Sequence, residues 1–272
     1  MKLGGKVVVI TGSTRGIGRE VAEACAMEGA MVVISSRQAS AVEQVCEELK
    51  RKGYKVSGIR ADVSKQNDLD ELLLHAIETW GQVDVWINNA GMSGGYMPLV
   101  ELSREEIDAV VDVNLKGTLN ACRIIIPFFI GIGGGLVINM SGKGGRGDPS
   151  PYLTAYSATK AAVTNLSRSL AVEYASYPIS IHSVLPGMVE TDFFRDIKTS
   201  PKLESITEEL PYVLNAFGVS IDDVGRFIAG IAAQKPGKTT GKQYTLIKGW
   251  RLLRGIVLIT WYRATSKLKS RI

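Results

Sequence analysis

The chain has 272 residues, of which 45% are hydrophobic and 22% charged, a balance that suits one soluble α/β domain with a large core. Its three cysteines are scattered and its two histidines lie far apart, so neither a disulfide framework nor a metal site is predicted. The N-terminal apolar run is too short for a secretory signal. We therefore expect a cytoplasmic protein that holds no metal.

The formal charge of +5 is unevenly spread along the chain. The last acidic residue is Asp223, and eleven cations follow it, which leaves 21 basic against 27 acidic residues at positions 1–223. This asymmetry indicates an anionic partner for the C-terminal part of the chain rather than a nucleic-acid-binding domain.

Short β-branched runs alternate with longer segments whose apolar residues recur every three or four positions. Strands are predicted at 6–11, 31–36, 55–60, 83–88, 135–140, 179–185 and 242–247, and helices at 16–28, 40–52, 66–79, 103–130 and 152–175. Most strand runs are continuously apolar, which is typical of strands buried on both faces of a parallel sheet. Residues 1–249 are thus predicted to form one Rossmann-type α/β domain, a doubly wound parallel sheet of about seven strands with helices on both faces, followed by a basic apolar extension, 250–272.

Ligands of such a sheet bind beyond the carboxyl ends of its strands, and TGSTRGIG (11–18) directly follows the first strand. Gly12, Gly16 and Gly18 allow a sharp turn and a close approach to a pyrophosphate, whose charge would meet the amides at the start of the helix. Because no Gly-Lys-Ser/Thr follows, the loop is not a P-loop. The pattern predicts a dinucleotide site.

The end of the second strand indicates which dinucleotide is bound. An NAD-specific protein has a carboxylate there for the ribose hydroxyls, whereas this chain has Ser35, Ser36 and Arg37. Arg15, inside the glycine loop, is a second cation. Two guanidinium groups suit a 2′-phosphate, so the sequence favours NADP(H) over NAD(H).

Tyr156 and Lys160 lie four residues apart and therefore share one face of the predicted helix. A phenol with an ordinary pKa near ~10 is a poor base at neutral pH, and the neighbouring cation is expected to lower that pKa. Taken alone, the pair is equally consistent with a packed tyrosine and a lysine that reaches solvent. SATK (157–160) also fits the S-x-x-K of serine acyltransferases, but no S-D-N or K-T-G partner follows at a useful place.

Six short motifs occur in an order and spacing typical of one family: TGSTRGIG (11–18), DV (62–63), NNAG (88–91), NLKG (114–117), YSATK (156–160) and PGMVET (186–191). With these motifs, residues 5–249 resemble the short-chain dehydrogenases/reductases. The resemblance implies a hydride transfer between the nicotinamide and a carbonyl or alcohol, and an assembly of two or four copies through helices 103–130 and 152–175.

The resemblance also implies roles for individual residues. The catalytic residues would be Tyr156, Lys160, Asn114 and Ser141. Tyr156 would exchange a proton with the substrate oxygen, Lys160 would hold the nicotinamide ribose, and Asn114 would anchor a proton-relay water. The cofactor would be bound by Gly12, Ser13, Thr14, Arg15, Gly16, Ile17, Gly18, Ser36, Arg37, Asp62, Val63, Asn89, Ala90, Gly91, Tyr156, Lys160, Pro186, Gly187, Val189 and Thr191.

The chain departs from the family pattern at the serine. Family members carry it thirteen residues before the tyrosine, whereas Ser141 precedes Tyr156 by fifteen. When the chains are aligned by the strand, Gly142 takes the usual serine's place. The glycine-rich loop 142–155 would bring Ser141 round to the substrate, or Ser150 or Thr154 would replace it.

The extension 250–272 is the second departure. Its apolar core, Ile256–Ile259, is far shorter than a membrane span of roughly 20 residues. Its aromatic residues and cations, with no acids among them, suit a peripheral contact with anionic lipid. The alternative is packing on its own subunit or on a neighbouring one.

A segment rich in apolar residues follows the last motif and sits where the family places its substrate lid. Its candidate wall consists of Phe193, Phe194, Tyr212 and Phe217, with Met92, Met97 and Met188. This wall favours a lipophilic secondary alcohol or carbonyl as substrate. The predicted function is an NADP(H)-dependent oxidoreductase that binds no nucleic acid, and the alternative is a non-catalytic NADP(H)-binding regulator or scaffold.

Overall fold

Seven parallel strands form one sheet in the order β3-β2-β1-β4-β5-β6-β7. The order of the strands reverses between β1 and β4, which is the switch point of the sheet. The computed structural model describes residues 1–190, 198–203 and 208–265. The strands are β1 Val7–Ile10, β2 Met31–Ser36, β3 Val56–Arg60, β4 Val85–Asn88, β5 Gly135–Met140, β6 Ile179–Leu185 and β7 Gln243–Thr245. Each coincides with a predicted strand, and the Rossmann-type single domain is confirmed.

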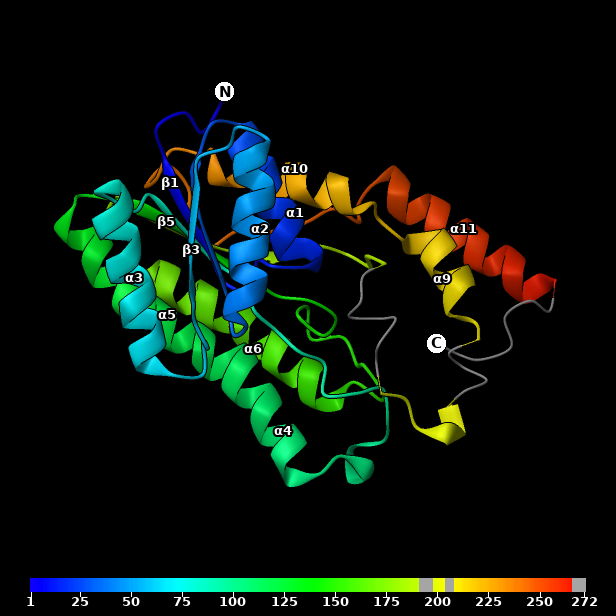
Figure 1. Cartoon of the computed structure of the whole chain (residues 1–272). Coiled ribbons are helices and arrows are strands. Elements are labelled where there is room, and N and C mark those ends of the chain that lie inside the picture. The colour runs from blue at the N-terminus through cyan, green and yellow to red at the C-terminus, as the bar shows by residue number, and fades with distance from the viewer. Residues whose placement is uncertain (191–197, 204–207, 266–272) are drawn as a thin grey trace.

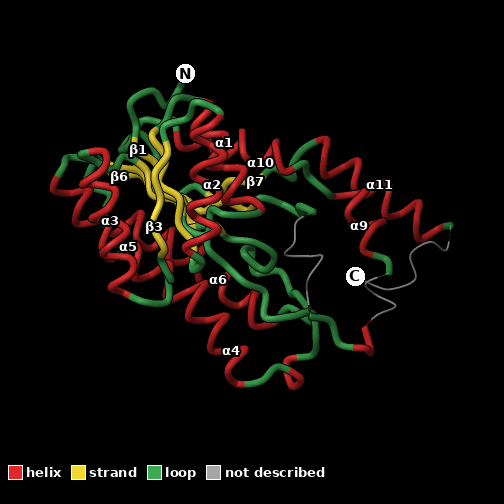
Figure 2. Tube along the Cα trace, in the orientation of Figure 1, coloured by secondary structure: helices red, strands yellow, loops and turns green. Residues whose placement is uncertain are grey.

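Helices cover both faces of the sheet (Figures 1 and 2). They are α1 Gly16–Met27, α2 Ala39–Arg51, α3 Gln66–Trp80, α4 Arg104–Val111, α5 Gly117–Gly131, α6 Thr154–Glu173, α9 Leu210–Phe217, α10 Ile221–Ala232 and α11 Trp250–Ala264, with short 3-10 turns at Leu99–Glu101 and Pro201–Leu203. In β1, Val8 and Ile10 pack with α1, α2 and α10, whereas Val7 and Val9 pack with α3 and α5 on the other face. This alternation explains why the strand runs are apolar throughout.

One long helix covers much of the second face. Residues Arg104–Gly131 are helical throughout and, by length and composition alone, long and apolar enough to cross a membrane. Here Ile125 and Phe129 are fully buried in the core beside the sheet, as expected for a core helix of a globular domain. Between α4 and α5 the helix widens into a π-helical turn, Asp112–Lys116, which the sequence did not predict.

The C-terminal extension forms α11, which packs on α9 at the edge of the domain (Figure 1). Tyr262 is buried there and meets Tyr212 edge to face, with the ring centroids 5.1 Å apart. Phe217 packs against Gly255, where an added Cβ atom would stand 2.2 Å from the ring. Tyr212 and Phe217, expected in the substrate wall, therefore hold α9 to α11.

Candidate active site

The glycine loop after β1 has the backbone that a pyrophosphate site requires. Gly12 and Gly16 have φ angles of +63° and +53°, a region that favours glycine. At Gly18 an added Cβ atom would stand 2.3 Å from the Asn89 amide nitrogen. Among the described residues, no side chain caps the first turn of α1, and that turn contains no acidic residue. Its amides and the positive end of the helix dipole therefore suit an anion.

Two side chains of this region tie the loop to the sheet. The Ser13 hydroxyl donates to the carbonyl oxygen of Ile10 at 2.7 Å and accepts the amide of Ser35 at 2.9 Å. Asn89 donates from its side-chain amide to the carbonyl oxygens of Thr11 and Gly12, both at 2.9 Å. The structure thus gives Ser13 and Asn89 a framework role beside the cofactor role that the sequence predicted.

Exposed cations make up the predicted 2′-phosphate site, and the predicted cofactor residue Asp62 carries an ionised carboxylate near one of them. Arg15 and Arg37 are both exposed, and Ser36 is half-buried at the end of β2. Asp62 follows β3; burial alone would raise its pKa, but hydrogen bonds from Ser64 and the charges of Arg37 and Lys65 keep that pKa lowered. The carboxylate is therefore ionised close to Arg37.

Tyr156 and Lys160 lie on α6 and face the carboxyl ends of β4 and β5. Lys160 is 4% exposed, and its ammonium donates to the carbonyl oxygen of Met140 at 2.9 Å. The Lys160 nitrogen lies 5.6 Å from the centroid of the Tyr156 ring. A Cβ atom at Gly142 would stand 2.4 Å from the Tyr156 hydroxyl oxygen, and one at Gly91 would stand 3.4 Å from the Lys160 nitrogen. A side chain at Gly142 would therefore collide with the phenol, and one at Gly91 would contact the ammonium.

The pKa shifts of this pair are both caused by burial. Burial raises the pKa of Tyr156 and lowers that of Lys160 to about 8. We predicted a lowered pKa for Tyr156 from the neighbouring cation, and in this structure the shift has the opposite direction. Loss of solvation outweighs the attraction between a phenolate and an ammonium group at this separation.

Asn114 is fully buried in the π-helical turn and points at the same place. Its amide nitrogen donates to the Met92 carbonyl oxygen at 2.9 Å and to the Thr159 hydroxyl at 3.1 Å, and its side-chain oxygen accepts the Met92 amide at 2.9 Å. A Cβ atom at Gly91 would stand 3.2 Å from that oxygen. Asn114 thus joins the loop after β4 to α6, beside Lys160.

Ser141 points into α6. Its hydroxyl lies 2.8 Å from the Thr164 hydroxyl and donates to the carbonyl oxygen of Lys160 at 3.0 Å. Gly142 is the residue that lies against the Tyr156 hydroxyl. Ser141 is therefore bonded to the catalytic helix in this structure.

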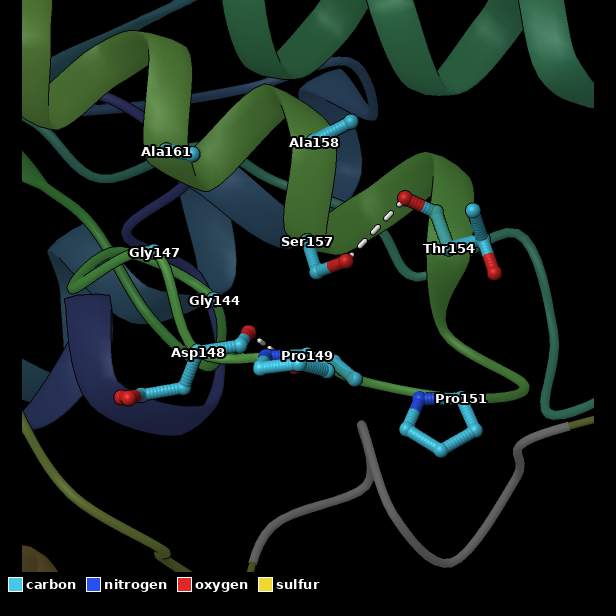
Figure 3. Close-up of a pocket in the computed structure, with 10 residues that line it drawn as sticks. Gly144, Gly147, Asp148, Pro149, Pro151, Thr154, Ser157, Ala158 and Ala161 are labelled. Carbon is cyan, nitrogen blue, oxygen red and sulfur yellow. Dashed lines mark hydrogen bonds between the residues drawn. The ribbon is translucent and has the colours of Figure 1, made fainter.

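The other serine and threonine candidates line a separate cavity of about 490 Å³ between the loop 142–153 and α6. Figure 3 shows Thr154, Ser157 and Pro151 around this cavity, and the Ser157 hydroxyl donates to the Thr154 carbonyl oxygen at 3.1 Å. Ser150 also lines the cavity and donates to the Asp148 carbonyl oxygen at 3.3 Å. The cavity therefore holds both substitutes proposed for Ser141.

The remaining predicted cofactor residues follow β6. Pro186 and Val189 are buried, and Gly187 has a φ angle of +93°. Thr191, Phe193 and Phe194 lie outside the described residues. Sequence reasoning missed Thr159 and the carbonyl oxygen of Met140 as partners of Asn114 and Lys160, because a lone threonine and a backbone atom carry no motif.

A doubly wound parallel sheet, a glycine loop at the switch point and a half-buried tyrosine beside a buried lysine and a buried asparagine define a dinucleotide-binding oxidoreductase. The chain belongs to the short-chain dehydrogenase family. Residues 6–202 match the family model described as short chain dehydrogenase, which confirms the resemblance seen in the sequence.

Curated relatives cover nearly the whole chain. A 3-oxoacyl-[acyl-carrier-protein] reductase of Staphylococcus epidermidis is 33% identical over 87% of this chain and 95% of that protein. The oxidoreductase UcpA of Salmonella typhimurium is 31% identical over 91% of this chain and 95% of that protein. A chlorophyll(ide) b reductase of Arabidopsis thaliana, NOL, is 31% identical over 97% of this chain and 73% of that protein.

Solved structures show the same fold. A 3-ketoacyl-(acyl-carrier-protein) reductase from Brucella melitensis complexed with NADH has a TM-score of 0.77 at 29% identity, covering 89% of this chain and 97% of that chain. A 7α-hydroxysteroid dehydrogenase complexed with NADH and 7-oxo glycochenodeoxycholic acid has a TM-score of 0.78 at 25% identity, covering 90% of this chain and 93% of that chain. A nicotinamide cofactor is therefore supported for this chain.

Proposed function

We propose that the protein reduces a ketone on a lipophilic substrate with NADPH, using Tyr156 as general acid. The observation that carries the proposal is the cluster of Tyr156, Lys160 and Asn114, which lie against the backbone of two glycines, Gly91 and Gly142. A bound nicotinamide supplies the hydride to the carbonyl carbon. Tyr156 then delivers its hydroxyl proton to the carbonyl oxygen, so that an alcohol and a phenolate result.

The raised pKa of Tyr156 supports the reducing direction. A phenol whose pKa is raised keeps its proton at neutral pH and is a proton donor from the outset. Lys160, with a pKa near 8, is still largely cationic at neutral pH and stabilises the negative charge that develops on Tyr156. Asn114 bonds both to Met92 and to Thr159 on α6, and so holds these two segments together next to Lys160.

NADP(H) is proposed rather than NAD(H) because of Arg15 and Arg37. Both guanidinium groups are exposed where a 2′-phosphate would lie, and residues 35–38 contain no carboxylate. The glycine loop, the uncapped first turn of α1 and the turns around Asp62, Ala90 and Gly187 fit the remainder of such a cofactor.

A lipophilic substrate is proposed from two observations. Tyr96 and Tyr152 meet edge to face, with centroids 5.5 Å apart, in the loops that lead towards the catalytic helix, and Met97 donates its amide to the Tyr152 carbonyl oxygen. The relatives and neighbours named above are a 3-oxoacyl-[acyl-carrier-protein] reductase, a chlorophyll(ide) b reductase and a dehydrogenase in complex with 7-oxo glycochenodeoxycholic acid.

Members of the family commonly form oligomers, and we propose a homodimer or homotetramer here. Leu119 on α5 is 41% exposed and Val172 on α6 is 79% exposed. These apolar side chains lie on the two helices through which the resemblance predicts assembly. We propose the cytoplasm as the compartment, since the buried cysteines are all free thiols.

The test is NADPH consumption with a 3-oxoacyl thioester and with a bicyclic ketone, by the wild type, Tyr156→Phe and the control Tyr177→Phe. Tyr177 is an exposed tyrosine away from the site. We expect Tyr156→Phe to lose a factor of about 10² to 10⁴ in kcat while NADPH binding and the control remain normal. NADPH binding without turnover of any carbonyl would instead support the regulator, and equal turnover by Tyr156→Phe would exclude Tyr156 as the acid.

A further inference from the structure

Helix α11 presents a stripe of large apolar side chains to solvent. Trp250, Leu253, Ile256, Val257 and Trp261 are 77%, 57%, 49%, 66% and 50% exposed. Their spacing of three and four residues places them on one side of a helix, and the 15-residue helix is about 22 Å long. A contiguous apolar patch of this kind marks an interaction site rather than ordinary surface.

The opposite side of α11 is fixed to the domain. Tyr262 and Gly255 are buried against α9, and Leu258 and Ile259 are partly buried in the same cluster. Arg251 forms an ion pair with Asp223 at 2.8 Å, which joins α11 to the first turn of α10. The stripe is therefore held facing outwards by packing on its back.

Charge surrounds the stripe in a definite pattern. With 3.6 residues per turn, Arg254 falls on one border of the stripe and Arg263 on the other, and both are exposed. Residues 224–272 contain eleven cations and no carboxylate. The three arginines of α11 thus have separate roles. Arg251 binds Asp223, while Arg254 and Arg263 flank the apolar side chains.

We propose that this face of α11, the apolar stripe with its two flanking arginines, docks on an anionic membrane surface. Apolar and tryptophan side chains would enter the boundary between headgroups and acyl chains, and the arginines would reach the lipid phosphates from both borders. A second α11 from another copy fits less well, because it would bring further arginines to the same place and no carboxylate to meet them.

The docking face is close to the substrate side of the domain. α11 packs on α9, which ends at Phe217. The next residue, Gly218, pairs with Met188 in the segment that follows β6. Met188 also packs in the cluster that contains Tyr262. Only α9 would therefore separate a bilayer under α11 from the segment after β6, which is predicted to contact the nicotinamide.

The test is cosedimentation of the full chain with phosphatidylcholine vesicles that either contain or lack phosphatidylserine. We expect binding only with phosphatidylserine, and a fall of at least about tenfold in the partition coefficient of Leu253→Glu with Val257→Glu. The matched control is Met27→Glu with Leu74→Glu, which adds the same charge at two exposed apolar residues of α1 and α3. NADPH binding by each variant checks that the domain is folded.

Two further double variants distinguish the electrostatic attraction of the lipid from the apolar contact. Arg254→Glu with Arg263→Glu is expected to weaken binding at least about tenfold. Arg51→Glu with Lys55→Glu, at the end of α2 and just before β3, is expected to weaken it much less. The proposal is overturned if the α11 variants bind vesicles as the wild type does, or if binding is equal without phosphatidylserine. It is also overturned if the α11 variants only dissociate an oligomer, since the stripe would then be an interface between copies.

Discussion

The hydroxyl of Tyr156 lies against the backbone of Gly142, so closely that a Cβ atom at residue 142 would stand 2.4 Å from the phenolic oxygen. In the family pattern this place is taken by a serine, whose hydroxyl meets the substrate oxygen. Here the Tyr156 hydroxyl itself approaches the place where that side chain would begin. A glycine therefore stands beside Tyr156 in place of the family's serine, and the Ser141 hydroxyl bonds to α6.

Restoring the family residue is expected to harm the enzyme. In Gly142→Ser the added Cβ atom would displace the Tyr156 hydroxyl, and a displacement of about 1 Å is expected to cost about a hundredfold in kcat. The control is Gly131→Ser at the end of α5, where an added Cβ atom meets nothing within 4 Å. Ketone reduction as fast as wild type in Gly142→Ser would show that the loop 142–153 relaxes to accept a serine.

The pH dependence of reduction should follow Lys160 and not Tyr156. Below a pKa of about 8 Lys160 is cationic and stabilises the developing phenolate, and above it that charge is lost. Tyr156, whose pKa is raised, keeps its proton throughout this range. We expect kcat/KM for ketone reduction to be level at neutral pH and to fall as the pH rises through about 8. A profile that stays level until the ordinary lysine pKa near 10.5 would contradict the expectation that burial lowers the pKa of Lys160.

The fold could be predicted from the sequence because each of its elements repeats one simple pattern. β5, for example, is apolar at almost every residue and buried throughout, and strand-to-helix alternation then limits the connections to right-handed crossovers. The shared helix face of Tyr156 and Lys160 follows equally from their spacing. Such features depend on residues that are neighbours along the chain or along a helix.

The remainder of the site depends on contacts between distant segments. The direction of the Ser141 hydroxyl is decided by Thr164 on another element, and the pKa of Tyr156 is raised by loss of solvation in the folded domain. The π-helical turn that presents Asn114 is stabilised by Met92 and Thr159. No spacing in the sequence encodes these partners, which is why the sequence predicted the wrong direction for the Tyr156 pKa.

Cofactor preference offers a test of the exposed guanidinium groups. In Arg37→Asp the 2′-phosphate would lose a cation and meet a carboxylate, which should weaken NADPH binding about tenfold or more, whereas NADH gains a partner for its ribose hydroxyls. Fluorescence titration with both nucleotides measures the ratio of the two dissociation constants. Arg51→Asp, an exposed arginine at the end of α2, is the control. An unchanged ratio in Arg37→Asp would assign the 2′-phosphate to another residue or remove the preference for NADPH.

Ser141 can be tested as a positioning residue that acts through α6. In Ser141→Ala the Thr164 hydroxyl and the Lys160 carbonyl oxygen each lose a buried partner, which should lower the free energy of unfolding by about 1–3 kcal/mol. Urea denaturation measures this loss, and the double variant with Thr164→Val should lose less than the two single variants together, since the two hydroxyls bond to each other. NADPH binding should persist, with a loss in kcat of less than about tenfold, because Gly142 and not Ser141 lies beside the Tyr156 hydroxyl. A large loss of kcat at unchanged stability would instead mean that Ser141 turns towards the substrate during the reaction.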